Sequence, residues 1–266
     1  MSEQLTDTHC HLDFQAFNND RKLIIERARD AGVIRILNPA IDLPTSQEIV
    51  RLAEVTPEVF AAVGIHPNDA LTFEAGTIDE LRKLLSSPKV RAVGEIGLDY
   101  YRDRAPRDIQ MDAFQQQLAL AEEAGLPVII HNREASSDIM EVLEDWYREL
   151  VKSNPTLAAN PGVLHSFSAS LEIAQRAMAI NFFIGITGPV TFKNAPELQE
   201  LVTSLPLDHL LIETDAPFLT PHPHRGKRNE PSYVLFTAEK IASLKNLPFS
   251  VVAETTTRNA SRLFHW

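Results

Sequence analysis

The sequence predicts a single α/β domain that folds as a (β/α)8 TIM barrel with an extra C-terminal helix. Eight short apolar runs recur along the chain, and segments with helical periodicity lie between them. The length of 266 residues also matches the usual size of such a barrel. A doubly wound open sheet is the alternative, but an open sheet seldom needs eight regular units.

The eight apolar runs are rich in β-branched residues and are mostly followed by Gly, Pro, Asn or Asp. Runs of this kind are typical of strands that are buried on both faces of a parallel sheet. The predicted strands, in chain order, are residues 5–9, 33–40, 59–66, 90–97, 127–131, 162–166, 182–187 and 210–215.

The segments between these runs repeat apolar residues at helical spacing, as Leu23, Ile24 and Ala28 do in the first of them. The longest begins at Pro106 and ends before Gly125, and both are typical helix-terminus residues. The predicted helices are residues 20–31, 45–55, 78–85, 106–124, 135–151, 171–180 and 196–205, followed by 232–244 and 250–264. Because no low-complexity linker interrupts this alternation, we expect one domain over residues 1–266.

Composition narrows the classes of function. The net charge of −11 argues against a protein held on nucleic acid by bulk positive charge, although bound divalent metals could still create a local phosphate site. Cys10 is the single cysteine, so no intramolecular disulfide can form. The first residues do not resemble a signal peptide, and no apolar run reaches membrane-spanning length. We therefore expect a cytoplasmic protein with no membrane contact and no obligate protein partner.

Metal-ligating side chains gather at the carboxyl ends of the predicted strands, where this fold places its chemistry. The candidate ligands are His9, His11, Glu95, His131, His165 and Asp215. Four imidazoles and two carboxylates in one mouth would leave buried polar groups unpaired, and metal cations remove that cost. Six ligands are too many for one four-coordinate metal but suit two divalent cations, which Glu95 is best placed to bridge.

The order and spacing of several motifs resemble the TatD family of metal-dependent hydrolases, within the amidohydrolase-like barrels. The motifs are DTHCHLD at 7–13, GIHP at 64–67, GEIGLDYYR at 94–102, HNREA at 131–135, LHSF at 164–167, IETDAPFL at 212–219 and HRGKRNEP at 224–231. The resemblance implies a two-metal site at the six positions named above and phosphodiester hydrolysis, typically by a deoxyribonuclease with exonuclease character. Two departures, Asn132 and Ser166, replace residues beside the ligands and could alter their hydrogen bonding without changing a ligand.

The sequence therefore predicts a metal-dependent hydrolase of ester bonds, most simply a 3'-5' exonuclease acting on DNA. We expect His9, His11 and Asp215 to hold one cation, and His131 and His165 to hold the other. Asp215 and Glu95 are the predicted catalytic residues: Asp215 takes a proton from the attacking water, and Glu95 is shared by the two cations. The ligand types do not distinguish zinc, manganese, magnesium, nickel and cobalt.

A basic loop follows the eighth predicted strand, and such loops often bind phosphate in this fold. The candidates for substrate phosphate contacts are His66, Arg102, Arg133, Arg225 and Arg228. The alternatives are a hydrolase of a small ester, lactone or cyclic amide on the same metal centre, and a non-catalytic metal-binding scaffold. The scaffold is disfavoured because structural zinc sites are usually rich in cysteine.

Overall fold

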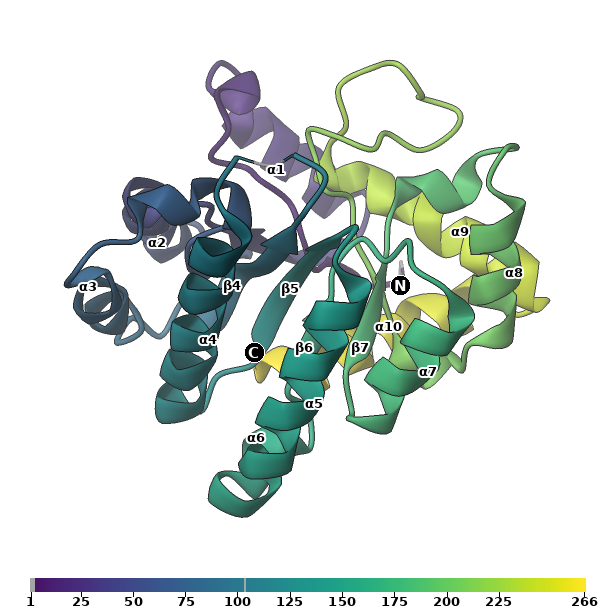
Figure 1. Cartoon of the computed structure of the whole chain (residues 1–266). Coiled ribbons are helices and arrows are strands. Elements are labelled where there is room, and N and C mark those ends of the chain that lie inside the picture. The colour runs from purple at the N-terminus through teal and green to yellow at the C-terminus, as the bar shows by residue number, and fades with distance from the viewer. Residues whose placement is uncertain (1–2, 103) are drawn as a thin grey trace.

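The computed structural model describes residues 3–102 and 104–266 and confirms the predicted barrel (Figure 1). The strands are β1 (Leu5–Asp7), β2 (Val33–Pro39), β3 (Val59–Val63), β4 (Val90–Asp99), β5 (Val128–Arg133), β6 (Gly162–Leu164), β7 (Phe183–Ile186) and β8 (Leu210–Ile212). They form one parallel sheet in the order β1 to β8. The Thr8 N–H donates to the Ile212 carbonyl at 3.2 Å and brings the first strand back to the last. This return excludes the doubly wound alternative.

The helices lie outside the strands and alternate with them (Figure 1). They are α1 (Arg21–Asp30), α2 (Leu43–Val55), α3 (Thr77–Leu84), α4 (Arg107–Ala124), α5 (Ser136–Ser153), α6 (Pro155–Ala158), α7 (Leu171–Ala179), α8 (Pro196–Ser204), α9 (Val234–Lys245) and α10 (Phe249–Phe264). Short 3-10 helices occupy Gln15–Phe17, Pro67–Thr72, Gly188–Thr191, Leu207–His209 and Pro231–Tyr233. Over the described ranges, none of these helices combines the length and apolar character needed to cross a membrane.

Four predicted strands extend too far at the carboxyl end of the barrel. β1, β3, β6 and β8 each end two or three residues earlier than predicted. The residues beyond these ends leave the regular ladder: Ser166 and Asp215 have positive φ angles of 43° and 54°. These departures carry the chain out of the ladder at the mouth of the barrel, where the candidate ligands stand.

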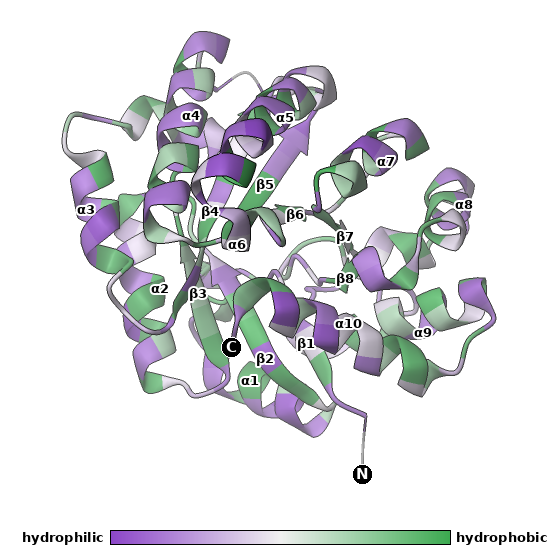
Figure 2. Ribbon diagram, turned by 90° about the horizontal axis from the view of Figure 1, so that it is seen from below, coloured by the Kyte–Doolittle hydropathy of each residue, from purple (hydrophilic) through white to green (hydrophobic). Residues whose placement is uncertain are grey.

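The amino end of the barrel is closed by an apolar layer. One buried cluster takes residues from seven consecutive strands and from α10, and such residues can meet only inside the barrel. Its members are Leu37, Ala62, Ala92, Ile129, Val163, Phe183, Leu211, Ala260, Leu263 and Phe264. Seen from below, α10 lies across this opening (Figure 2). The predicted extra C-terminal helix is therefore the plug of the barrel.

The same strands pass from this apolar layer to a polar one. Residues two apart on a strand point to the same side, so the inward direction of Val163 is shared by His165, and that of Leu211 by Glu213. At the carboxyl ends of β6 and β8, the step from the apolar layer to the ligand layer is therefore a single side-chain repeat.

Candidate metal centre

Five predicted ligands meet at the carboxyl end of β1, β4, β6 and β8. His9 Nε2 lies 3.2 Å from His11 Nε2 and 3.4 Å from Glu95 Oε2. Asp215 Oδ1 lies 3.5 Å from His11 Nε2 and 3.9 Å from His165 Nε2. The rings of His9 and His165 stack with 3.4 Å between their centroids. These segments are far apart in the chain, and the barrel brings their polar tips together.

The second oxygen of Glu95 faces a different pair of imidazoles. Glu95 Oε1 lies 2.7 Å from His131 Nδ1 and 3.8 Å from His66 Nε2. The groups of three that could share one cation are His9 with His11 and Asp215, His9 with Glu95 and His165, and His66 with Glu95 and His131. None of these groups contains both His131 and His165, so the sharing of one cation by these two residues stays a prediction.

Two further carboxylates orient the outer histidines. His165 Nδ1 donates to Glu213 Oε2 at 2.9 Å, and His131 Nε2 donates to Asp99 Oδ2 at 3.3 Å. Each bond leaves the other ring nitrogen facing the centre, toward Asp215 for His165 and toward Glu95 for His131, an arrangement common behind metal-ligating histidines. Sequence reasoning missed both carboxylates. For Glu213, the available signal was the two-residue period of a strand. Glu213 precedes the predicted ligand Asp215 by two positions, and residues two apart on a strand point to the same side.

Glu213 is held by its surroundings as well as by the histidine. The Ser166 N–H donates to Glu213 Oε2 at 2.9 Å, and Glu213 is fully buried. A Cβ at Gly185 would lie 2.3 Å from Glu213 Oε1, so any other residue at this position of the neighbouring strand would displace the carboxylate. The position of this carboxylate is thus built into β7 as well as into β8.

Asp7 joins β1 to the segment that carries Asp215. The Thr214 N–H donates to Asp7 Oδ1 at 2.9 Å, and the Thr214 hydroxyl donates to Asp7 Oδ2 at 2.5 Å. Burial raises the pKa of Asp7 to about 8, although the bonds from Thr214 oppose the rise. Asp7 therefore serves to close the barrel between β1 and β8 beside the site.

His66 differs from the other histidines in its tautomer. The backbone N–H of Asn68 donates to His66 Nδ1 at 3.0 Å, so this nitrogen carries a lone pair. Burial, with the charge of His131, lowers the pKa of His66 to about 3, and the neutral ring then holds its proton on Nε2. Because Nε2 bears a proton and faces Glu95, His66 is suited to donate a hydrogen bond rather than to ligate a cation.

The electrostatics of the centre fit bound cations. His9 Nδ1 and His11 Nδ1 are buried without a hydrogen-bond partner, and their Nε2 atoms face each other. Burial alone would raise the pKa of Glu95, but His165 and His9 hold it well below the usual range, so the carboxylate is ionised. Burial likewise opposes a charge on His165, yet Glu213 and Glu95 raise its pKa to about 9. A cation bound here would take the place of these protons.

Three of the predicted phosphate-binding arginines are exposed around the mouth of the barrel. Arg133 is exposed and its guanidinium lies 4.0 Å from the centroid of the Tyr101 ring. Arg225 is exposed in the loop after β8, 4.3 Å from the centroid of Phe192. Arg102 is also exposed, just beyond the end of β4.

Arg228 is also exposed, and it pairs with a carboxylate. Its Nη1 and Nη2 atoms donate to Asp20 at 3.0 and 2.6 Å at the edge of the loop. A substrate phosphate would have to share these donors with Asp20, so the contact between Arg228 and a substrate phosphate stays a prediction.

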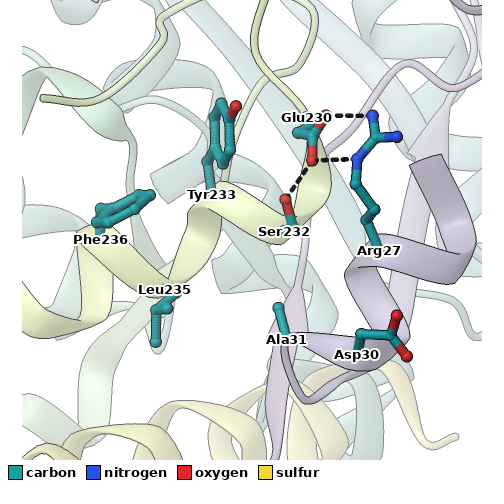
Figure 3. Close-up of a pocket in the computed structure, with 8 residues that line it drawn as sticks. All are labelled: Arg27, Asp30, Ala31, Glu230, Ser232, Tyr233, Leu235 and Phe236. Carbon is teal, nitrogen blue, oxygen red and sulfur yellow. Dashed lines mark hydrogen bonds and ion pairs between the residues drawn. The ribbon is translucent and has the colours of Figure 1, made fainter. Parts of the chain in front are cut away.

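The loop after β8 is fastened to α1 by a second ion pair (Figure 3). Arg27 Nε and Nη2 donate to Glu230 at 2.9 and 2.6 Å, and the Ser232 hydroxyl donates to Glu230 Oε1 at 2.5 Å. A shallow cleft of about 520 Å³ lies between these residues and Tyr233. Arg27 and Glu230, which line this cleft, are paired with each other, so we place the functional site at the metal centre.

Comparisons with known proteins agree with this architecture. The family model described as TatD related DNase matches residues 6–265. The chain is 45% identical over 260 residues to the "Uncharacterized metal-dependent hydrolase YabD" of Bacillus subtilis, covering 98% of each chain. It is 36% identical over 265 residues to the "3'-5' ssDNA/RNA exonuclease TatD" of Erwinia tasmaniensis, covering 97% of this chain and 99% of the relative.

A solved structure shows the same likeness in three dimensions. The crystal structure of YJJV, a TatD homologue from Escherichia coli K12, superposes with a TM-score of 0.91 at 32% identity and covers 100% of both chains. The sequence match and the structural match both extend over essentially the whole barrel. The chain therefore belongs to the TatD family of metal-dependent hydrolases.

Proposed function

We propose that the protein is a two-metal phosphodiesterase that removes nucleotides from the 3' end of single-stranded DNA or RNA. The observation that carries this proposal is the buried set of imidazoles and carboxylates around Glu95, at the catalytic end of the barrel. Two relatives with 36% identity are named 3'-5' ssDNA/RNA exonuclease, which favours this substrate among the esters that the family could hydrolyse.

Glu95 is the residue best placed to be shared by two cations, because its two oxygens face different imidazoles. His9, His11 and Asp215 would hold one cation. His131 would hold the other on the far side of Glu95, with His165 facing the shared carboxylate. Divalent cations bound there would lower the pKa of a water molecule and stabilise negative charge on the phosphoryl oxygens.

Asp215 is the proposed proton acceptor. Burial opposes its ionisation, but the bond from His11 and the charge of His165 lower the pKa of Asp215, so the carboxylate can take a proton. Asp215→Asn keeps the shape of the side chain and removes its capacity to accept a proton. We expect kcat to fall by about 100-fold or more while the bound metal content stays within twofold. Steady-state kinetics and elemental analysis of the same sample would measure both; near-normal turnover would overturn the assignment.

His66 and the basic rim are proposed to hold the substrate. His66 Nε2–H faces the centre and can donate to a phosphoryl oxygen beside Glu95. Arg133, Arg225 and Arg102 are exposed near the mouth and can contact phosphates on either side of the scissile bond. These contacts give a local basic rim to a protein whose overall charge is −11.

The decisive assay uses 5'-labelled single strands with added manganese, magnesium or zinc. A ladder that shortens stepwise from the 3' end is expected, and Glu95→Gln should abolish it. A lactone and a cyclic amide are assayed in parallel with the same preparations. If the metal-loaded protein hydrolyses one of these and leaves the strands intact, the nuclease proposal is wrong. If it turns over none of the three, the metal centre is non-catalytic.

A further inference from the structure

Two phenylalanines form a ledge beside the metal centre. The ring of Phe14 stacks on His11, with 4.8 Å between centroids and an interplanar angle of 28°. Phe218 meets Phe14 edge to face at 5.5 Å. We call Phe14 and Phe218 the aromatic ledge. Phe14 follows the DTHCHLD motif and Phe218 follows Asp215 by three positions, so both arise from segments that also carry candidate ligands.

Phe218 is half exposed, with 50% of its surface accessible. Its backbone is nevertheless fixed, because its N–H donates to the Asp215 carbonyl at 2.8 Å and its carbonyl accepts from Asn229 Nδ2 at 2.6 Å. Asn229 is itself buried and also donates to the Thr214 carbonyl at 2.8 Å. A large apolar ring that is half exposed on a fixed backbone gains little folding stability and is available to bind a flat apolar group.

The ring of Phe218 is also less covered by neighbouring groups than the ring of Tyr101, which is likewise exposed near the mouth. Tyr101 is 57% exposed, but the guanidinium of Arg133 lies over its ring at 4.0 Å. In the sheet order, β4, which ends two residues before Tyr101, and β5, which ends with Arg133, lie across the barrel from β8 and β1. The aromatic ledge and the Tyr101–Arg133 pair therefore flank the metal centre from opposite sides.

We propose that the aromatic ledge stacks against the base of a nucleotide next to the scissile phosphate. This rests on the proposed nuclease function and adds to it the residues that select the substrate. An aromatic ring can stack on any of the four bases, but only when the base is unpaired and splayed from its neighbours. The ledge would therefore give a preference for unpaired ends with little preference for sequence. A duplex end would have to fray before it could bind.

The test compares Phe218→Ala with the wild-type protein on three otherwise identical 5'-labelled strands. One strand is intact, one has an abasic tetrahydrofuran residue at the 3' terminus, and one has that residue at the penultimate position. Because stacking on an aromatic ring adds to the affinity for each base, we expect KM for the intact strand to rise about tenfold, with kcat within twofold. Phe218→Trp should restore the wild-type KM.

The proposal requires that loss of the Phe218 ring and loss of the base have non-additive effects on KM for one of the two abasic strands. On that strand, wild type and Phe218→Ala should have the same KM, because the base that the ring would contact is already missing. Leu23→Ala is the matched control: Leu23 is 55% exposed on α1, and its loss should leave every KM unchanged. If Phe218→Ala raises KM equally on all three strands, or on none, the aromatic ledge does not bind a base.

Fluorescence anisotropy with the same 5'-labelled strands separates this inference from the proposed function. Binding that weakens about tenfold in Phe218→Ala, without cleavage by the wild type, would support the ledge and overturn the nuclease proposal. Cleavage by the wild type with no effect of Phe218→Ala would support the nuclease proposal and overturn the role of the aromatic ledge. Neither binding nor cleavage would overturn both.

Discussion

The two ends of this barrel are built from the same strands with opposite chemistry. At the amino end, Leu211 packs with residues of six other strands beneath α10. At the carboxyl end, Glu213 and Asp215 of the same segment face histidines across buried polar contacts. At the apolar end, buried side chains pack on one another. At the polar end, the buried Nδ1 atoms of His9 and His11 have no hydrogen-bond partner. The comparison indicates that the plugged end contributes to folding stability by apolar packing, whereas the open end is arranged for binding cations.

The largest expected effect comes from breaking the plug. Phe264 is buried among the inward residues of the strands, and Phe264→Ala removes the ring and leaves a cavity. We expect the free energy of unfolding to fall by about 3–5 kcal/mol. Turnover per folded molecule should stay within twofold of wild type. Urea unfolding and active-site titration measure the two quantities; a large loss of turnover in the folded fraction would show that the two ends are coupled.

Metal removal tests the same comparison at the carboxyl end of the barrel. Cations that bind only the folded protein should stabilise it by about 2.7 kcal/mol at 100 times their Kd. Phe264→Ala should keep this increment, and Glu95→Gln should lose most of it. Thermal unfolding with and without chelator measures the increment in each variant. Equal increments in wild type and Glu95→Gln would exclude Glu95 as a shared ligand.

The next effect concerns the carboxylate behind His165. Glu213→Gln keeps a polar group but weakens the bond that orients the ring. We expect metal affinity to fall by about 10- to 100-fold, with smaller changes in the metal-free stability. Isothermal titration calorimetry of the metal-free protein measures this affinity. Gln116→Glu, an exposed change on α4, serves as the surface control.

The smallest effect is expected at the ion pair that fastens the loop after β8. Burial opposes ionisation of Glu230, but bonds from Arg27 and Ser232 lower its pKa below the usual value. Arg27→Gln should reduce the free energy of unfolding by about 1.5 kcal/mol at pH 7. Because the pKa is lowered in the folded state, this contribution is present above about pH 4.3 and is lost as the pH falls further.

The control for that variant is on the same helix. Arg29 pairs with Glu58, but 58% of the Arg29 side chain is exposed, so Arg29→Gln should cost only about 0–1 kcal/mol. Urea titrations of both variants at pH 7 and pH 3.5 provide the measurement. Equal losses for the two variants, or a loss for Arg27→Gln that grows in acid, would contradict the role assigned to Glu230.

The sequence predicted the strands well because apolar runs report burial directly. It predicted their ends less well: β8 ends at Ile212 instead of at residue 215, since the positive φ of Asp215 departs from regular strand geometry. The short helix α6 was missed, although Asn154 and Pro155 are good signals for a helix start. Short elements bury little surface, so their local patterns stand out weakly from those of loops.

The candidate site was predictable where its residues are rare and polar, as His9, Glu95 and His165 are. The ion pair of Arg228 was not, because its partner Asp20 lies more than two hundred positions away in the chain. The tautomer of His66 depends on a backbone N–H whose direction no pattern reveals. Pairings across the barrel therefore need coordinates, whereas the types of side chain at strand ends do not.

The plug has a consequence for biosynthesis. α10 packs against β1 and β8 and completes the apolar layer, yet it is translated after every strand of the sheet. A nascent chain on the ribosome therefore exposes the lower inner faces of its strands until residues 249–264 have left the exit tunnel. During that interval chaperone contact is expected to centre on Leu37, Ile129 and Phe183, and release should coincide with docking of the last helix.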